Sequence, residues 1–82
     1  MMQILDGKSP SAVFKEMLLD RPQLDNGDLA TAFHAEFPET GLDAIQYIWK
    51  WKRPGKSAGL DDERLDQRLI YLLRRAGYLL ND

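Results

Sequence analysis

The sequence predicts a small all-α domain, because helix start signals recur four times along its 82 residues and an apolar stripe at helical spacing follows each one. A chain of this length has room for a single domain, so residues 1–82 are expected to fold as one unit. Hydrophobic residues make up 44% of the chain, which is enough for one core shared by three or four helices. We therefore expect a compact four-helix domain with a longer C-terminal helix.

The first two predicted helices begin at residues suited to cap a helix. Ser9 can accept a free backbone N–H, Pro10 suits the first turn, and Pro22 ends this helix at about Asp20. Asp25 begins the second helix, and the aspartate three positions later completes a capping box. A proline ends this second helix as well. The residues before Ser9 are expected to form a flexible or short extended segment that ends in a turn.

The third and fourth helices follow the same pattern. Thr40 is the predicted cap of the third, with an acidic residue in the capping-box position, and Arg53 is its predicted end. A short turn with glycine joins the second helix to the third, which is typical of a helix-turn-helix core. Asp61 caps the fourth helix, arginines occupy its last turn, and Gly77 is a natural C-cap.

The predicted core consists of the apolar side chains that share one stripe on each helix. Every stripe must be covered by another helix, and one compact bundle satisfies all four. The expected core residues are Val13, Met17, Leu18, Leu29, Phe33, Phe37, Leu42, Ile45, Ile48, Trp49, Leu65, Leu69, Leu72 and Leu73.

Several classes of function find no support in the composition. There is no cysteine, which excludes disulfides, thiol catalysis and cysteine-bound metal, and the single histidine, His34, has no acidic residue at the facing positions four residues before and after it. We therefore expect no catalytic residues, no metal, no cofactor and no small-molecule substrate. The chain lacks a secretory leader and a stretch long enough to span a membrane, so a cytoplasmic protein with no membrane contact is expected.

The charge distribution is uneven. The net charge is −2, yet residues 1–43 carry three basic and eight acidic side chains, whereas residues 44–82 carry eight basic and five acidic ones. No acidic residue occurs between Ala44 and Leu60. This pattern leads to two hypotheses for a non-enzymatic binding module.

The first hypothesis is a nucleic-acid-binding regulator, with DNA or RNA as its partner. The third helix would be the recognition helix of a helix-turn-helix unit, and its face opposite the core carries polar and basic residues that can contact base edges and phosphates. The residues expected to bind nucleic acid are Gln46, Tyr47, Lys50, Arg53 and Lys56.

The second hypothesis is a protein-interaction module or a homodimer, whose partner is an acidic protein surface or the acidic half of a second copy. Helical phase places Trp51 away from the core stripe, and a stripe of arginines on the fourth helix lies beside its leucines. The residues expected to bind protein are Tyr47, Trp51, Arg64, Arg68 and Arg75. A competing interpretation, favoured by the complementary charges of the two halves, pairs these arginines with acidic residues of the same chain.

Overall fold

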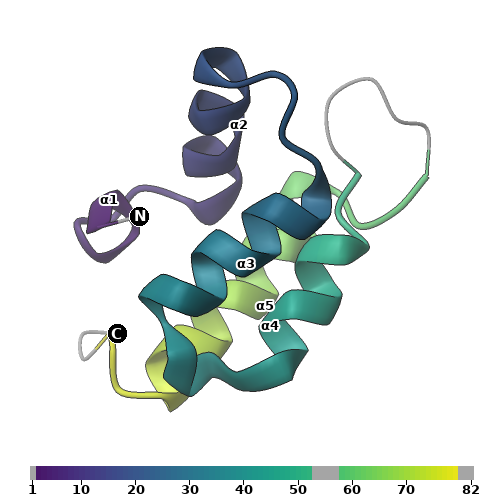
Figure 1. Cartoon of the computed structure of the whole chain (residues 1–82). Helices are drawn as coiled ribbons and strands as arrows, with labels where there is room; N and C mark the ends of the chain where they lie inside the picture. The colour runs from purple at the N-terminus through teal and green to yellow at the C-terminus, as the bar shows by residue number, and fades with distance from the viewer. Residues whose placement is uncertain (1, 53–57, 80–82) are drawn as a thin grey trace.

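The structure is a computed structural model, and it describes residues 2–52 and 58–79. Within these residues the chain is helical, which confirms the predicted all-α domain with the longest helix at the C-terminal end (Figure 1). The elements are α1 (Met2–Leu5), α2 (Pro10–Asp20), α3 (Asn26–Glu36), the 3-10 turn η1 (Pro38–Thr40), α4 (Gly41–Trp49) and α5 (Asp62–Arg75).

Three of the predicted helix caps are confirmed. The Ser9 hydroxyl accepts the N–H of Ala12 at 3.4 Å, and the Asp61 carboxylate accepts the N–H of Arg64 at 2.8 Å. Asp25 and Asp28 each accept the other's backbone N–H, at 2.8 and 3.0 Å, which is a complete capping box. These caps satisfy backbone donors that helices leave free at their first turn, so they set where α2, α3 and α5 begin.

Two details of the predicted elements differ in the structure. The N-terminal segment is not extended: α1 forms one helical turn, and its Ile4 is buried because it packs into the core. Thr40 is the N-cap residue of α4, as predicted, but its side chain makes no capping bond; its hydroxyl instead donates to the carbonyl of Phe37 at 2.6 Å. This bond keeps Thr40 in the 3-10 turn, and α4 begins after it at Gly41.

Helices α3 and α4 form the most extensive contact of the fold and run side by side in opposite directions (Figure 1). Each buries an alanine, Ala30 on α3 and Ala44 on α4, and such small side chains allow two helices to approach closely. Helix α5 packs on α4 and also on α2. Helix α5 therefore links the N-terminal part of the chain to the α3–α4 pair.

A row of aromatic side chains runs through the core. Ring centroids are 5.7 Å apart for Trp51 and Phe14, 6.2 Å for Phe14 and Phe33, and 5.0 Å for Phe33 and Phe37. Tyr78 continues the row at 5.0 Å from Phe37, beyond the C-terminal end of α5. Aromatic pairs at these distances stabilise a core beyond the area that they bury. The row thus connects α2, α3 and the segments that flank α4 and α5.

Most of the predicted core is confirmed, but the buried face of α4 differs from the prediction. Trp49 and Leu42 are 61% and 70% exposed, whereas Trp51 is only 2% exposed. The reason is that α4 ends at Trp49, so helical phase no longer determines where Trp51 points. Trp51 instead forms an isolated bridge with Leu60, with the N–H of Lys52 donating to the Leu60 carbonyl at 2.7 Å. This bridge turns the indole into the core.

The remaining predicted core residues fall into two groups. Met17, Leu18 and Ile45 are partly buried against the core rather than inside it. The others are buried as predicted: Val13, Leu29, Phe33, Phe37, Ile48, Leu65, Leu69, Leu72 and Leu73.

Candidate functional site

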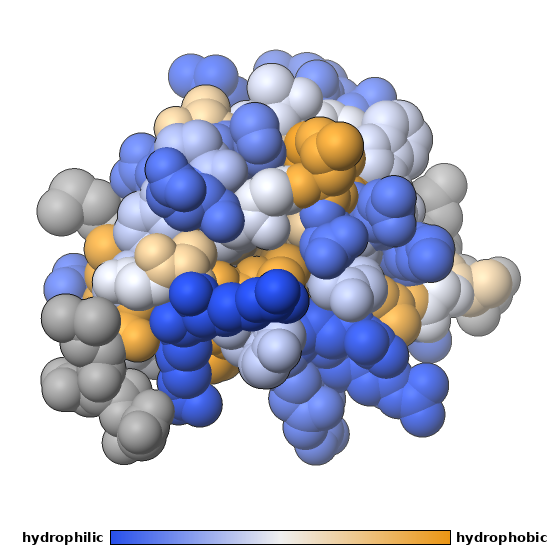
Figure 2. All heavy atoms as spheres, turned by 90° about the horizontal axis from the view of Figure 1, so that it is seen from below, coloured by the Kyte–Doolittle hydropathy of each residue, from blue (hydrophilic) through white to orange (hydrophobic). Residues whose placement is uncertain are grey.

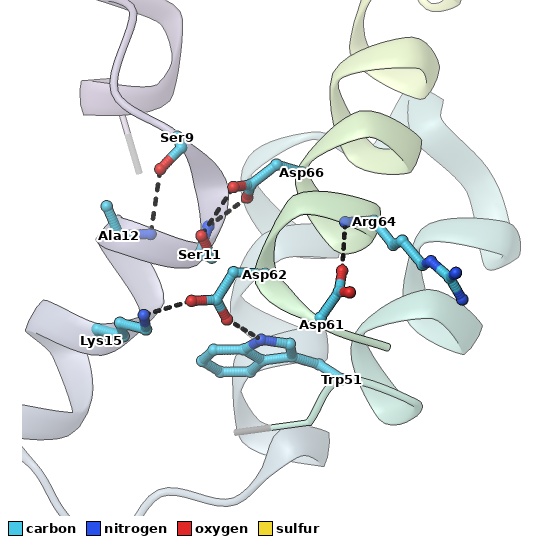
Figure 3. A network of polar contacts seen from close by, with 9 residues as sticks. All are labelled: Ser9, Ser11, Ala12, Lys15, Trp51, Asp61, Asp62, Arg64 and Asp66. Carbon is cyan, nitrogen blue, oxygen red and sulfur yellow. Dashed lines mark hydrogen bonds and ion pairs between the residues drawn. The ribbon is translucent and has the colours of Figure 1, made fainter. Parts of the chain in front are cut away.

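The acidic side chains of α5 that face α2 are used in internal contacts. Asp66 accepts the N–H of Ser11 at 2.7 Å and its hydroxyl at 2.8 Å, close to the start of α2. Asp62 accepts the indole N–H of Trp51 at 3.0 Å and forms an ion pair with Lys15 (Figure 3). These contacts join α2, α5 and the end of α4, so both carboxylates have structural roles.

Asp62 is held in its charged form by its two partners. The hydrogen bond from Lys15, followed by the one from the Trp51 indole, keeps the pKa of Asp62 below its ordinary value of 3.8, although partial burial acts in the opposite direction. The carboxylate is therefore ionised at neutral pH. This state suits its role as a double acceptor between α2 and Trp51.

The arginines of α5 do not form the ion pairs with acidic residues of the same chain that the charge distribution favoured. Among the residues that the structure describes, the ion pairs are Lys8 with Glu16, Lys15 with Asp62, and Arg21 with Asp20, and none includes an arginine of α5. Figure 3 shows the Arg64 side chain extending away from the Asp61 carboxylate that caps its own backbone N–H. The expectation of intramolecular pairing is therefore wrong for these described contacts, and Arg64, Arg68 and Arg75 are exposed.

Two of these arginines gather around two tyrosines. The Arg68 guanidinium carbon lies 5.1 Å from the centroid of the Tyr47 ring, which is a cation–π contact between α5 and α4. A pocket of about 420 Å³ includes this pair and is lined by Tyr47, Arg64, Gln67, Arg68 and Tyr71. Tyr71 is 60% exposed, whereas Tyr47 is half-buried. These five residues are called the α4–α5 basic pocket.

Arg75 belongs to a different part of the surface. It lines a pocket with Glu39, Thr40 and Asp43, where the α3–α4 connection meets the end of α5. Arg75 thus lies near acidic groups, whereas none of the described residues that line the α4–α5 basic pocket carries a carboxylate. The predicted stripe of three arginines therefore divides in two: Arg64 and Arg68 lie in the α4–α5 basic pocket, and Arg75 lies among acidic residues.

The three described residues that were predicted to bind nucleic acid, Gln46, Tyr47 and Lys50, do not all lie on one surface. Gln46 and Lys50 lie on the exposed side of α4, whereas Tyr47 turns toward α5 and stacks with Arg68. The difference follows from helical geometry, since neighbouring residues point about 100° apart. Arg53 and Lys56 lie outside the described residues.

The protein-binding prediction needs a correction at Trp51. Its side chain is buried and hydrogen-bonded to Asp62, so it cannot contact a partner, and the exposed tryptophan is Trp49. The prediction for Trp51 is wrong because it assumed a helix that continues to Arg53, whereas α4 ends at Trp49. Leu42, which was predicted to be in the core, is exposed on the same helix.

One face of the molecule shows few connected apolar areas. In Figure 2, the face seen from below Figure 1 is mainly hydrophilic, with hydrophobic residues in separate groups. Exposed large apolar side chains are therefore notable where several share one helix face, as on α4.

Searches for other kinds of site give no candidates. Across residues 2–52 and 58–79, no group of three or more histidine, cysteine or acidic side chains is arranged to bind a metal ion. No helix in the described part of the chain combines the length and apolar character needed to cross a membrane. Comparisons with protein-family models, curated proteins and solved structures find no match to this chain.

Proposed function

We propose that this protein is a non-enzymatic binding module whose α4–α5 basic pocket recognises an acidic segment of a partner protein. The observation that carries the proposal is the presence of Arg64 and Arg68, without ion pairs among the described residues, beside Tyr47 and Tyr71 in one pocket. Arginine forms two parallel hydrogen bonds to a carboxylate, and tyrosine supplies contact area with few rotatable bonds.

The size and composition of the pocket favour protein over duplex nucleic acid. Tyrosine and arginine are the residue types enriched at energetically important positions of protein interfaces. Duplex binders commonly neutralise about 6–10 phosphates, whereas this pocket offers two cations in a chain of net charge −2. A carboxylate-bearing peptide therefore matches the available charge better.

Arg68 has a further property that suits a binding residue. Its guanidinium lies over the Tyr47 ring, which restricts the side chain before any partner arrives. A restricted side chain loses less conformational entropy on binding, so each hydrogen bond to a partner carboxylate contributes more affinity. Arg64 and Gln67 also line the pocket from α5 and extend the set of donors.

An amide chemical-shift titration tests the proposal, with a glutamate-rich peptide, a single-stranded oligonucleotide and a duplex as separate probes. We expect the peptide to shift the amides of Tyr47, Arg64, Arg68 and Tyr71, with affinity that weakens as salt rises. The Arg64→Ala/Arg68→Ala variant should lose these shifts. Arg74→Ala is the matched control, because Arg74 is exposed on the same helix but lines a different pocket.

Two outcomes contradict the proposal. Equal binding of the peptide to the double variant means that the pocket is not the site. Shifts with either nucleic acid but not with the peptide, lost in the same double variant, mean that the pocket binds phosphates rather than the carboxylates of a partner protein.

A further inference from the structure

We infer that the outer face of α4 is a self-association surface, on which a second copy of this chain packs with its own α4 in the opposite direction. The face lies on the side of α4 away from Ala44 and Ile48, which are both buried. It is separate from the α4–α5 basic pocket, so the inference goes beyond the proposed function and does not depend on it.

The midline of this face, along the helix axis, carries a large apolar side chain at each end. Leu42 and Trp49 are 70% and 61% exposed, and their spacing of seven residues places them two turns apart on the same side of the helix. Gln46 lies between them and is also exposed. Large apolar side chains that share an exposed helix face are typical of residues that a partner covers.

The edge of the face carries opposite charges at opposite ends. Asp43 lies in the first turn of α4 and Lys50 immediately follows its last residue, and both are exposed. At about 100° per residue these two side chains point in nearly the same direction, on the edge that is nearer Tyr47. Ile45 lies on the other edge and is partly buried.

This arrangement complements itself when two copies pack about a two-fold axis. Antiparallel packing of two α4 helices places Leu42 of each copy opposite Trp49 of the other, with Gln46 near the axis. The same operation brings Asp43 of each copy to Lys50 of the other, because a two-fold axis perpendicular to the helices keeps matching edges together. Parallel packing about an axis along the helices would instead place the two charged edges on opposite sides of the contact, where Asp43 and Lys50 cannot pair. The antiparallel arrangement is therefore the one that uses these charges.

Trp49 is held in position for such a contact. Its ring lies against Gly27 at the start of α3, where an added Cβ would come within 2.9 Å of the Trp49 Cζ2 atom. The glycine therefore leaves room for the indole to lie across the α3–α4 pair. A side chain that is already oriented loses less entropy on binding.

Sedimentation equilibrium over a wide concentration range tests the inference. Because the face spans a nine-residue helix, we expect a weak dimer that forms only at high concentration. Trp49→Ala should raise the dimer Kd by about tenfold or more, as expected for a central aromatic contact. Leu42 and Trp49 are both exposed in the single chain, so their replacement should leave the fold intact. Circular dichroism of each variant checks that the helices are retained.

Charge reversal separates this geometry from a general loss of affinity. Asp43→Lys alone and Lys50→Asp alone each create two like-charge contacts in the dimer, so each should raise the Kd by about tenfold. The double variant restores both attractive contacts and should dimerise again. A mixture of the two single variants should form a heterodimer, because each contact between the two chains is then attractive.

Three results would overturn the inference. One is a monomer at every concentration up to about 1 mM. The second is a dimer whose Kd does not respond to Trp49→Ala. The third is failure of both the double variant and the mixture to recover association while all the chains remain folded. None of these results affects peptide binding at the α4–α5 basic pocket, so failure here is distinguishable from failure of the proposed function.

Discussion

The two sides of α5 carry charged residues with different roles. On the side that faces α2, Asp62 and Asp66 accept hydrogen bonds from Trp51 and Ser11 and join three segments of the chain. On the side that faces solvent, Arg64 and Arg68 form no ion pair among the described residues and instead line a pocket with two tyrosines.

This difference shows how charge is divided between folding and binding. Buried or partly buried hydrogen bonds to carboxylates stabilise a fold, whereas exposed cations contribute little to it. The acidic side of α5 is therefore expected to determine stability, and its basic side is available for a partner. Substitutions that affect only one side are the way to test this division.

The largest effect is expected at Trp51, which Asp62 holds against the core. Trp51→Ala should lower the free energy of unfolding by about 3–5 kcal/mol, because it leaves a cavity beside Phe14 and removes the donor to Asp62. Urea unfolding followed by circular dichroism measures this loss. The control is Trp49→Ala, measured in dilute solution, which should cost less than about 1 kcal/mol because that side chain is mostly exposed. Equal losses for the two variants would contradict the assignment of one buried and one exposed indole.

A smaller effect is expected at Asp66. Asp66→Ala removes the acceptor for the backbone N–H and hydroxyl of Ser11, so the free energy of unfolding should fall by about 1–3 kcal/mol. Arg64→Ala, on the opposite side of the same helix, should change it by less than about 0.5 kcal/mol. Denaturant titrations of both variants give the comparison directly. A loss at Arg64 as large as that at Asp66 would remove the distinction between the two sides.

The smallest effect is a dependence of stability on pH through Asp62. Its pKa in the folded chain is lowered, first by Lys15 and then by Trp51, so the unfolded chain takes up the proton first as pH falls. The contribution of Asp62 is thus complete well above pH 3.8 and is lost as pH falls through the lower pKa of the folded state. Thermal unfolding at a series of pH values should show a shallower acid-side decline in Asp62→Asn than in the original chain. An identical decline in both would assign the acid sensitivity to other carboxylates.

Much of the fold could be predicted from local signals. Ser9, Asp25 and Asp61 begin helices because their side chains accept backbone N–H groups, and such caps act within a few residues of sequence. The leucines of α5 recur at helical spacing and are buried as expected. Local chemistry and local spacing were sufficient for these elements.

The surface of α4 could not be predicted in the same way. The stretch from Leu42 to Ile48 carries apolar side chains on more than one face of the helix. Periodicity alone therefore did not identify which face is buried. The position of Trp51 depends on a bridge to Leu60, which is a contact between segments separated by a loop. Acidic residues are common at the start of a helix, and this local reason was enough to account for those at the start of α5. The contacts of Asp62 and Asp66 with α2 were therefore not predicted.

The placement of the two tryptophans also gives the protein two optical reporters only two residues apart. The indole of Trp51 is enclosed and hydrogen-bonded, whereas that of Trp49 is open to solvent, so a dissolved anionic quencher such as iodide reaches only the second. Replacing Trp49 by phenylalanine leaves a chain whose fluorescence follows unfolding of the core. Replacing Trp51 by phenylalanine, which keeps an aromatic ring in the core, leaves a chain whose emission reports what covers α4. Fluorescence of the two single-tryptophan chains thus follows core unfolding and the covering of α4 separately, without any attached dye.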